Sequence, residues 1–216
     1  MNYLTLVNNV LRRIREDEIT VINQNAYAAL IGDFVNDAKV SIEEAWDWTA
    51  LRTSLSITTS NGVNEYTLTG FGDNFKYIKL LDTSNNITVP YQAKEWIDVQ
   101  NNSTDTPLEG KPIYFSFSQL DANGDMKIIL YPTPDAAYTL RMDAVVRQAP
   151  LALGEDVIKV PWLPVMHLAV AFAARERGET GGTSTVEYFG IADKYLADAI
   201  ALDASYHPEE TIFRVV

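Results

Sequence analysis

The stretch Leu163-Pro-Val-Met-His-Leu-Ala-Val-Ala-Phe-Ala-Ala174 decides the fold of this chain, because His167 is its only polar side chain. A helix that is apolar all round belongs at the centre of a packed domain or in a membrane. A membrane span needs about 20 apolar residues. This run is bounded by Pro161 and Pro164 on one side and by Arg175 on the other. We therefore predict a buried core helix.

Two N-terminal segments are predicted to be helices that pack against it. Tyr3–Arg15 has apolar residues at helical spacing, with Asn2 as its cap. Asn25–Leu51 is the longest periodic segment and ends in Trp46 and Trp48. Its apolar face comprises Tyr27, Ile31, Phe34, Val35, Ala38, Ile42, Ala45 and Trp46. Its opposite face is acidic and carries Asp33, Asp37, Glu44 and Asp47. This acidic stripe either is a solvated surface or faces the lumen of a ring.

A last helix is predicted from Thr183 to Ala204, after a glycine-rich turn at Gly178–Gly182. Its apolar face comprises Val186, Phe189, Leu196, Ala199 and Ile200. Neither terminal pair of helices can bury its apolar faces alone. The two ends of the sequence are therefore expected to meet in a four-helix bundle.

Between Thr53 and Arg147 the apolar residues recur with a period of two, which is typical of strands. Asn61-Gly62 is a hairpin signal, and a short helix is predicted at Gln92–Val99. The seven strand candidates are Leu55–Ile57, Tyr66–Leu68, Phe75–Leu81, Ile87–Tyr91, Ile113–Leu120, Met126–Tyr131 and Tyr138–Arg147. Short strands joined by turns favour an antiparallel sandwich or barrel. The predicted fold class is α+β, with a β module inserted into a helical bundle.

These patterns predict three domains. Residues 1–52 with 160–205 form the bundle, 53–159 the inserted β domain and 206–216 an extended C-terminal arm. Pro208 ends the last helix. The segment Glu209–Val216 then has β-branched and aromatic residues but no partner in sequence. We favour an intermolecular contact for this arm over a frayed terminus.

The composition excludes several classes of protein. The net charge is −12, with 29 acidic against 17 basic residues, which argues against a protein that grips nucleic acid through its phosphates. An acidic surface suits a conduit for DNA better. The chain has no cysteine, so disulfides and thiolate chemistry are excluded. Its N-terminus has no signal-peptide pattern, so synthesis in the cytoplasm is expected.

Catalytic and cofactor motifs are absent from the sequence. It has no phosphate-binding loop, dinucleotide fingerprint, HExxH motif or nucleophile elbow. We predict no catalytic residues, metal or cofactor. His167 is expected to be a core histidine. Asp121-Ala-Asn-Gly-Asp125 resembles a calcium loop but is better interpreted as a hairpin turn. The aromatics of the β segment, namely Tyr66, Tyr77, Tyr91, Trp96 and Tyr114, are interpreted mainly as core, with a carbohydrate or protein surface as the alternative.

Two motifs and the order of elements carry a family resemblance. Asp37-Ala-Lys39 is followed after five residues by Ala45-Trp-Asp-Trp48, and Val160-Pro-Trp-Leu-Pro164 leads into the buried helix. With terminal helix pairs around a β insertion, the sequence resembles the head-to-tail adaptor proteins of short-tailed bacteriophages, the group that includes tail tubular protein A.

This resemblance implies a non-enzymatic virion protein at the head-tail junction. It implies a homo-oligomeric, twelve-fold ring between the portal protein and the tail nozzle protein, which encloses the DNA channel without sequence-specific DNA binding or a membrane role. The family's C-terminal extension reaches a neighbouring component, and Ile212, Phe213 and Val215 are the expected anchors here. The alternatives are a carbohydrate-binding or hydrolysing tail component that uses aromatics of the β module, and a cytoplasmic binding module with no virion role.

Overall fold

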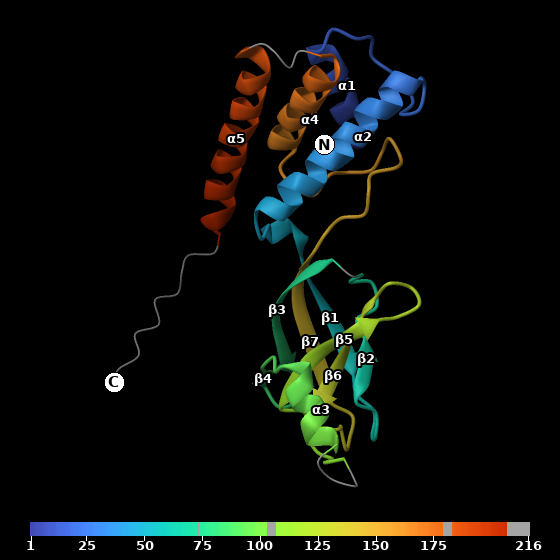
Figure 1. The fold of residues 1–216 in the computed structure, drawn as a ribbon, viewed down its shortest axis with the longest axis vertical. Helices are drawn as coiled ribbons and strands as arrows, with labels where there is room; N and C mark the ends of the chain where they lie inside the picture. Colours follow the sequence, from blue (N-terminus) through green and yellow to red (C-terminus); the bar gives the residue numbers. More distant parts are fainter. Residues whose placement is uncertain (73, 103–106, 179–182, 207–216) are drawn as a thin grey trace, which may run out of the picture. The chain divides into compact units, whose positions relative to one another are not determined.

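The computed structural model describes residues 1–72, 74–102, 107–178 and 183–206 (Figure 1). Over these residues the chain divides into two compact units. The helical unit comprises Met1–Leu51 and the described part of Arg147–Val216, and the β unit comprises Arg52–Val146. The fold is α+β, as predicted, while the predicted arm lies almost entirely outside the described residues.

The helical unit contains four of the α-helices, namely α1 (Tyr3–Arg13), α2 (Ala26–Ala45), α4 (Trp162–Glu176) and α5 (Thr183–Ala204). Two of them begin at asparagine caps. Asn2 Oδ1 accepts a hydrogen bond from the Thr5 amide at 2.9 Å, and Asn25 Oδ1 accepts one from the Ala28 amide at 2.7 Å. Such a cap stabilises a helix by about 1 kcal/mol. The N-terminal limits predicted from the sequence are thereby confirmed.

Helix α4 is the centre of the helical unit, where it contacts α1, α2 and α5. It lies between α2 and α5 in Figure 1. Its alanines and Val165, Met166 and Val170 are buried, and burying one side chain of the latter size contributes about 1.5–3 kcal/mol. The prediction that Asn25–Leu51 packs against this helix is confirmed, so helices from the two ends of the sequence meet.

Arg177, which follows α4, ties the C-terminal helices to the N-terminal ones. Its guanidinium donates to the Ile14 carbonyl at 2.9 Å and to the Tyr27 hydroxyl at 2.8 Å, and it pairs with Glu16. Gly178 follows with a φ of +80°, the left-handed conformation in which glycine commonly ends a helix. The predicted glycine turn therefore begins where expected, and residues 179–182 lie outside the described part.

The predicted helix at Asn25–Leu51 is longer than the observed one. Helix α2 ends at Ala45, because Trp46 is extended, with φ −154° and ψ 157°. Trp48 turns back so that its indole donates to the Ile42 carbonyl at 2.7 Å. A short 3-10 turn, η1 (Thr49–Leu51), leads into the β unit. Helix α2 thus ends before the two tryptophans, and neither of them continues its apolar face.

The predicted buried faces are partly wrong. On α2, Lys39 and Glu43 are buried, and Ala45 is exposed. On α5, Val186 is 74% exposed whereas Ala192 is buried. The reason is that α5 packs mainly against α4, so only the narrow face centred on Ala192 is covered.

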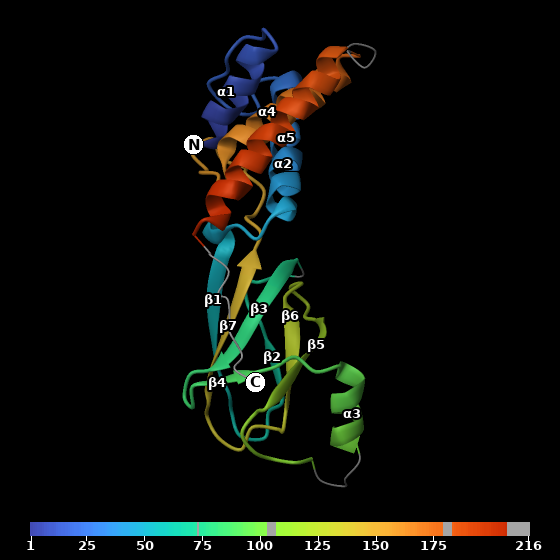
Figure 2. The same ribbon diagram turned by 90° about the vertical axis from the view of Figure 1, so that its left-hand side faces the viewer.

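The β unit contains two antiparallel sheets. The first has the order β1–β7–β3–β4 and the second the order β2–β6–β5. The strands are β1 (Arg52–Thr58), β2 (Glu65–Thr67), β3 (Phe75–Asp82), β4 (Ile87–Val89), β5 (Tyr114–Leu120), β6 (Met126–Tyr131) and β7 (Thr139–Val146). All seven predicted strands are present. The predicted short helix is α3 (Lys94–Asn102), which contacts β5 (Figure 2).

Side chains of both sheets share one hydrophobic core. Its fully buried members include Leu80, Leu140 and Met142 from the first sheet and Phe115, Ile128 and Leu130 from the second. Buried and partly buried residues alternate along most of β7, because successive side chains of a strand point to opposite faces and one face contributes to this core.

One turn prediction is wrong and another is confirmed. Gly62 has a φ of +75°, as a turn requires, but β1 pairs with β7 while β2 pairs with β6, so Asn61-Gly62 links two sheets. The Gly62 amide donates to the Pro134 carbonyl at 2.9 Å, which holds this turn against a distant loop. Asp121–Asp125 is the hairpin turn expected between β5 and β6, with Asp121 Oδ1 accepting from the Asn123 and Asp125 amides.

Candidate interaction surface

The acidic stripe predicted on the second helix lies within the helical unit. Asp33 and Asp37 are exposed, one turn apart on α2. Glu44 is exposed but forms an ion pair with Arg147, and Asp47 is half-buried beyond the end of the helix. Two free-standing acids therefore remain where four were expected. The assignment of these residues to a channel wall stays a prediction.

Asp33 acts on a neighbouring helix. Burial and, to a smaller extent, the negative charge of Asp33 together raise the pKa of Tyr3 to about 12. The Tyr3 hydroxyl, which accepts a hydrogen bond from Asn36 Nδ2 at 3.3 Å, therefore stays protonated at neutral pH. Tyr3 is thus a neutral packing residue beside the acidic stripe.

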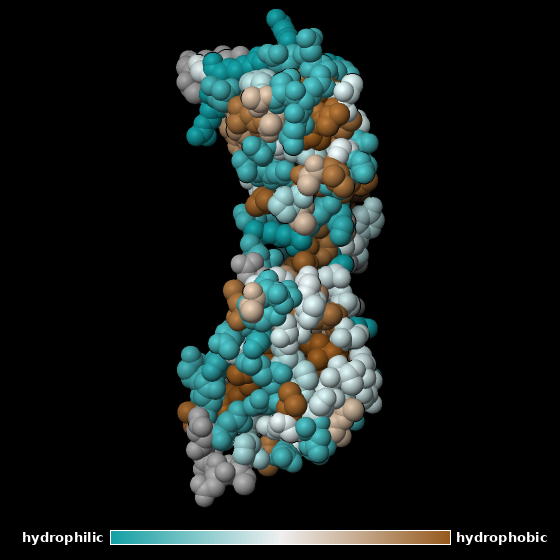
Figure 3. Space-filling view, turned by 90° about the vertical axis from the view of Figure 1, so that its right-hand side faces the viewer, coloured by the Kyte–Doolittle hydropathy of each residue, from teal (hydrophilic) through white to brown (hydrophobic). Residues whose placement is uncertain are grey.

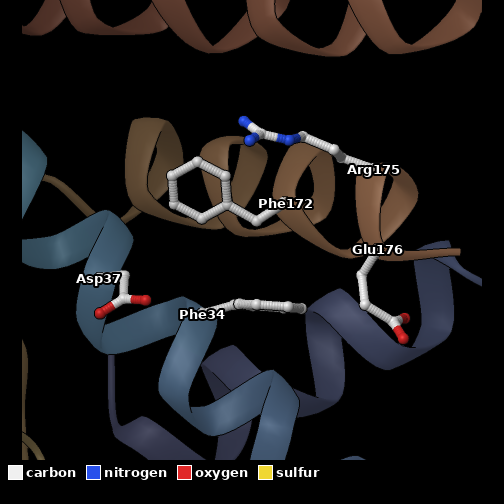
Figure 4. Close-up of a pocket in the computed structure, with 5 residues that line it drawn as sticks. All are labelled: Phe34, Asp37, Phe172, Arg175 and Glu176. Carbon is white, nitrogen blue, oxygen red and sulfur yellow. The ribbon is translucent and has the colours of Figure 1, made fainter. Parts of the chain in front are cut away.

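Asp37 lines an open pocket between α2 and α4, with a volume of about 370 Å³. Its other walls are Phe34, Phe172, Arg175 and Glu176. Figure 4 shows Phe34 and Phe172 between the two helices, with Asp37 on one side and Arg175 and Glu176 leaving α4 in different directions. The Phe34 and Phe172 rings meet edge to face at 6.2 Å.

The chemistry of this pocket suits a contact with another protein. Aromatic rings and arginine are enriched at the centres of protein interfaces. Arg175 forms no ion pair with another described residue, so its charge is available to a partner. Among the described residues that line the pocket, no histidine or hydroxyl side chain is present that would form a nucleophile-base pair with its carboxylates.

Helix α2 carries a buried ion pair that was not predicted from the sequence. Lys39 Nζ lies 3.1 Å from Glu43 Oε1 and donates to the Gln148 carbonyl at 2.7 Å. Burial raises the pKa of Glu43, although its hydrogen bond and ion pair with Lys39 oppose this shift. Both residues adjoin apolar positions, Ala38 and Ile42. Their spacing of four within the apolar face was the available signal.

His167 is half-buried rather than at the centre of the core. Its ring stacks on Tyr195 of α5, with centroids 4.7 Å apart and planes 16° apart. Burial lowers its pKa, and the nearby Arg13 adds to this effect. A neutral imidazole stacked on an aromatic ring serves packing between α4 and α5. A cluster of three or more acidic or histidine groups suited to a metal is not found in residues 1–72, 74–102, 107–178 and 183–206.

The aromatic residues of the β unit are largely used in packing. Tyr77 packs against Phe115 at 5.1 Å, and Trp96 packs edge to face on Tyr114 at 5.4 Å. Tyr91 is 53% exposed. These ring contacts stabilise the β unit, and a carbohydrate surface formed by its aromatic residues stays an alternative prediction.

The surface of the protein combines hydrophilic and hydrophobic residues. The face drawn in Figure 3 shows hydrophobic groups as separate patches among hydrophilic ones. None of the helices in the described part of the chain has the length and apolarity that a membrane crossing requires. The predicted anchors Ile212, Phe213 and Val215 lie outside the described residues.

The terminal helices and the inserted sheets form an α+β protein with an open pocket whose lining suits contact with another protein. Comparison of the whole sequence agrees with this class. The chain belongs to the SU10 adaptor protein family, a family of phage head-tail adaptors, and the family model matches residues 1–210. The resemblance to head-to-tail adaptors is thereby confirmed. None of the curated proteins searched matches the chain.

Proposed function

We propose that this chain forms a ring, twelve-fold in its symmetry, that joins the portal protein to the tail nozzle protein and encloses the DNA channel. The observation that carries this proposal is the family match over residues 1–210. It spans both units, so the helical unit and the β unit belong to one adaptor rather than to a fusion of unrelated parts.

The acidic stripe supports a lumenal face. Asp33 and Asp37 are exposed on α2, and the chain carries a net charge of −12. A ring multiplies each exposed carboxylate by the number of subunits, and like charges repel the phosphates of DNA. Such a wall lets DNA pass without holding it. We assign Asp33 and Asp37 to the channel wall, with Asp47 at its end and Glu44 screened by Arg147.

The C-terminal arm supplies the contact with a neighbouring virion protein. Within residues 206–216, the last six, Thr211–Val216, include Ile212, Phe213 and Val215, which are residue types enriched in strands. An extended apolar segment of this kind can add a strand to a sheet edge or fill a groove on a partner. We propose the portal protein as that partner.

Imaging of the purified protein with its portal tests the proposal. We expect rings of adaptor on the portal in negative stain, and no rings when the chain is truncated after Tyr206. The truncated chain should keep the far-UV circular dichroism of the helical and β units, since all described elements precede its end. Full occupancy of the portal by the truncated chain, or a monomer in every mixture with portal, would refute the proposal.

A further inference from the structure

A second groove lies in the helical unit, between the beginning of α4 and the end of α5. We call it the α4–α5 groove, and its volume is about 320 Å³. Its lining is mainly apolar. The lining residues are Met1, Trp48, Ala50, Ile158, Lys159, Val160, Pro161, Trp162, Ala199, Leu202, Asp203 and Tyr206.

Large apolar side chains in this groove are left in water. Trp162 is 37% exposed, Leu202 63% and Tyr206 64%. The buried Trp48, Ile158 and Val160 line the same groove. Covering such apolar surface is favourable by about 25 cal/mol per Å². The groove therefore has a physical reason to take an apolar occupant.

Hydrogen bonds hold the walls of the groove in place. Asp203 Oδ2 accepts from the Trp46 indole at 3.0 Å, the Thr49 amide at 3.1 Å and the Thr49 hydroxyl at 3.2 Å. These bonds attach the last turn of α5, with Leu202 and Tyr206, to the segment that follows α2. Because the walls of the groove are already fixed, they lose little conformational entropy when a segment binds.

The groove also carries a distinct charge pattern. Among the described residues that line the groove, Asp203 is the one acidic residue, and its carboxylate already accepts three hydrogen bonds. Lys159 is the one basic residue of the same described lining. It is exposed and makes no ion pair with the residues that the structure describes. The groove thus presents a cation next to apolar walls, which fits a segment with acidic and apolar residues in succession.

The sequence that follows Tyr206 has that composition. It reads His207-Pro-Glu-Glu-Thr-Ile-Phe-Arg-Val-Val216, with Glu209 and Glu210 ahead of the apolar residues. Tyr206 itself lines the groove, so these ten residues begin at its edge. Pro208 prevents continuation of the helix. Ten extended residues reach about 33 Å, which is ample for a return along the groove.

We propose that residues 207–216 occupy the α4–α5 groove of their own chain. Glu209 or Glu210 pairs with Lys159, and Ile212 and Phe213 cover Trp162 and Leu202. A short tether gives its own arm an effective concentration in the millimolar range. In dilute protein the arm of the same chain therefore outcompetes the arm of a second copy.

This contact has a consequence for assembly, and only this consequence depends on the proposed function. The residues that cover the groove are those proposed to bind the portal. In a free chain the groove would cover the anchors Ile212 and Phe213. The portal protein would bind the arm only after displacing it from the groove. Occupation of the groove can be measured on the full-length chain without portal, so its failure and the failure of the proposed function can be told apart.

The absence of cysteine allows a clean test in the full-length chain. Thr211→Cys is labelled with bimane, a fluorophore that tryptophan quenches on contact. We expect quenched emission that is unchanged over a hundredfold dilution. Trp162→Phe should relieve the quenching, whereas Trp96→Phe in the β unit should not. Circular dichroism confirms that each variant is folded.

The charge part of the proposal has its own variants. Lys159→Glu should raise the ratio of open to closed arm by a factor of about 2–5, the effect of one exposed ion pair. Glu209→Lys with Glu210→Lys should restore quenching in that background. The matched control Lys194→Glu changes an exposed cation on α5 outside the groove lining and should have no effect.

Three results would overturn the proposal. Emission that Trp162→Phe does not change would show that the arm lies elsewhere. Quenching that fades on dilution would assign the groove to the arm of a second copy. Equal effects of Lys159→Glu and Lys194→Glu would remove the pairing of the glutamates with Lys159.

Discussion

Lys39 and Glu43 form an ion pair one turn apart on α2, and neither side chain is exposed to solvent. Lys39 also donates to the Gln148 carbonyl, whereas Glu43 Oε2 has no hydrogen-bond partner among the described residues. The pair joins the C-terminal half of α2 to the segment that leaves β7. Removing one partner of this ion pair costs more stability than replacing both partners by apolar residues, because a buried charge without its partner is strongly destabilising.

Removal of one partner is therefore expected to destabilise the helical unit. Lys39→Met should lower the free energy of unfolding by about 3–5 kcal/mol, whereas Lys39→Met with Glu43→Leu should be nearly neutral or stabilising. Urea unfolding is followed by tryptophan fluorescence in a Trp96→Phe background. The remaining tryptophans, Trp46, Trp48 and Trp162, all lie in the helical unit. A double variant less stable than the single one would contradict this account.

The same pair makes stability depend on pH. Burial raises the pKa of Glu43 above its ordinary value of 4.5. The folded state thus holds the Glu43 proton more tightly than the unfolded state. Its contribution is complete below pH 4.5 and is lost as pH rises through the folded-state pKa. Glu43→Gln does not titrate. The parent protein should therefore gain stability relative to Glu43→Gln when pH falls from 7 to 5, and a constant difference would show an unshifted carboxyl.

Asp203 should anchor the end of α5. Asp203→Ala removes the carboxylate that accepts from the Trp46 indole and from the Thr49 amide and hydroxyl, at a cost of about 1–3 kcal/mol. Hydrogen exchange should accelerate at Ser205 and Tyr206. Asp198→Ala, on the exposed face of α5, serves as the control. Equal exchange in the two variants would mean that packing on α4 alone holds this end.

Gly32 allows α1 and α2 to approach closely. A Cβ at this position would lie 2.5 Å from Tyr3 Oη and 3.5 Å from Tyr3 Cζ. Gly32→Ala should therefore destabilise the protein by about 1–3 kcal/mol through overpacking. In a Tyr3→Phe background the clash is gone, and alanine should stabilise α2 by about 1 kcal/mol relative to glycine. Thermal unfolding of the parent protein, the two single variants and the double variant measures whether the effect of Gly32→Ala on stability changes sign. If it does not, the Tyr3 hydroxyl is not the cause of the destabilisation.

The assignment of Asp33 and Asp37 to a channel wall predicts a gain of DNA binding on charge reversal. Adaptor-portal assemblies with Asp33→Lys and Asp37→Lys should retain duplex DNA at low salt and release it steeply as salt rises, because binding to phosphates displaces counterions. Filter binding measures the retention. Asp193→Lys with Asp198→Lys on α5 makes the same change of charge elsewhere, and equal retention by both assemblies would remove the assignment.

The sequence predicts most of the element positions because periodicity is a local property. The strand Met126–Tyr131 and the helix Thr183–Ala204 appear with the predicted bounds. Pairing is a different matter. Asn61-Gly62 has the composition of a hairpin, but whether β1 joins β2 or β7 depends on contacts with residues more than 70 positions away. No short-range pattern carries that information.

The interaction surface was less predictable than the fold. Asp33 and Asp37 are exposed, as a pattern of alternating faces indicates, but the pairing of Glu44 with Arg147 joins residues 103 positions apart. The burial of Lys39 runs against the usual exposure of lysine. It follows from the Gln148 carbonyl that meets the ammonium, and that meeting arises only when the chain returns from β7.

The pairing of β1 with β7 places the first and last residues of the β unit next to each other, since Arg52 lies opposite Val145. Partners in an antiparallel ladder have Cα atoms about 4.5–5.5 Å apart. A linker of a few residues could therefore close the gap left by excision of the whole sheet pair. The β unit can thus be removed from the helical unit at a single junction. The same junction would accept a foreign domain whose own ends lie equally close.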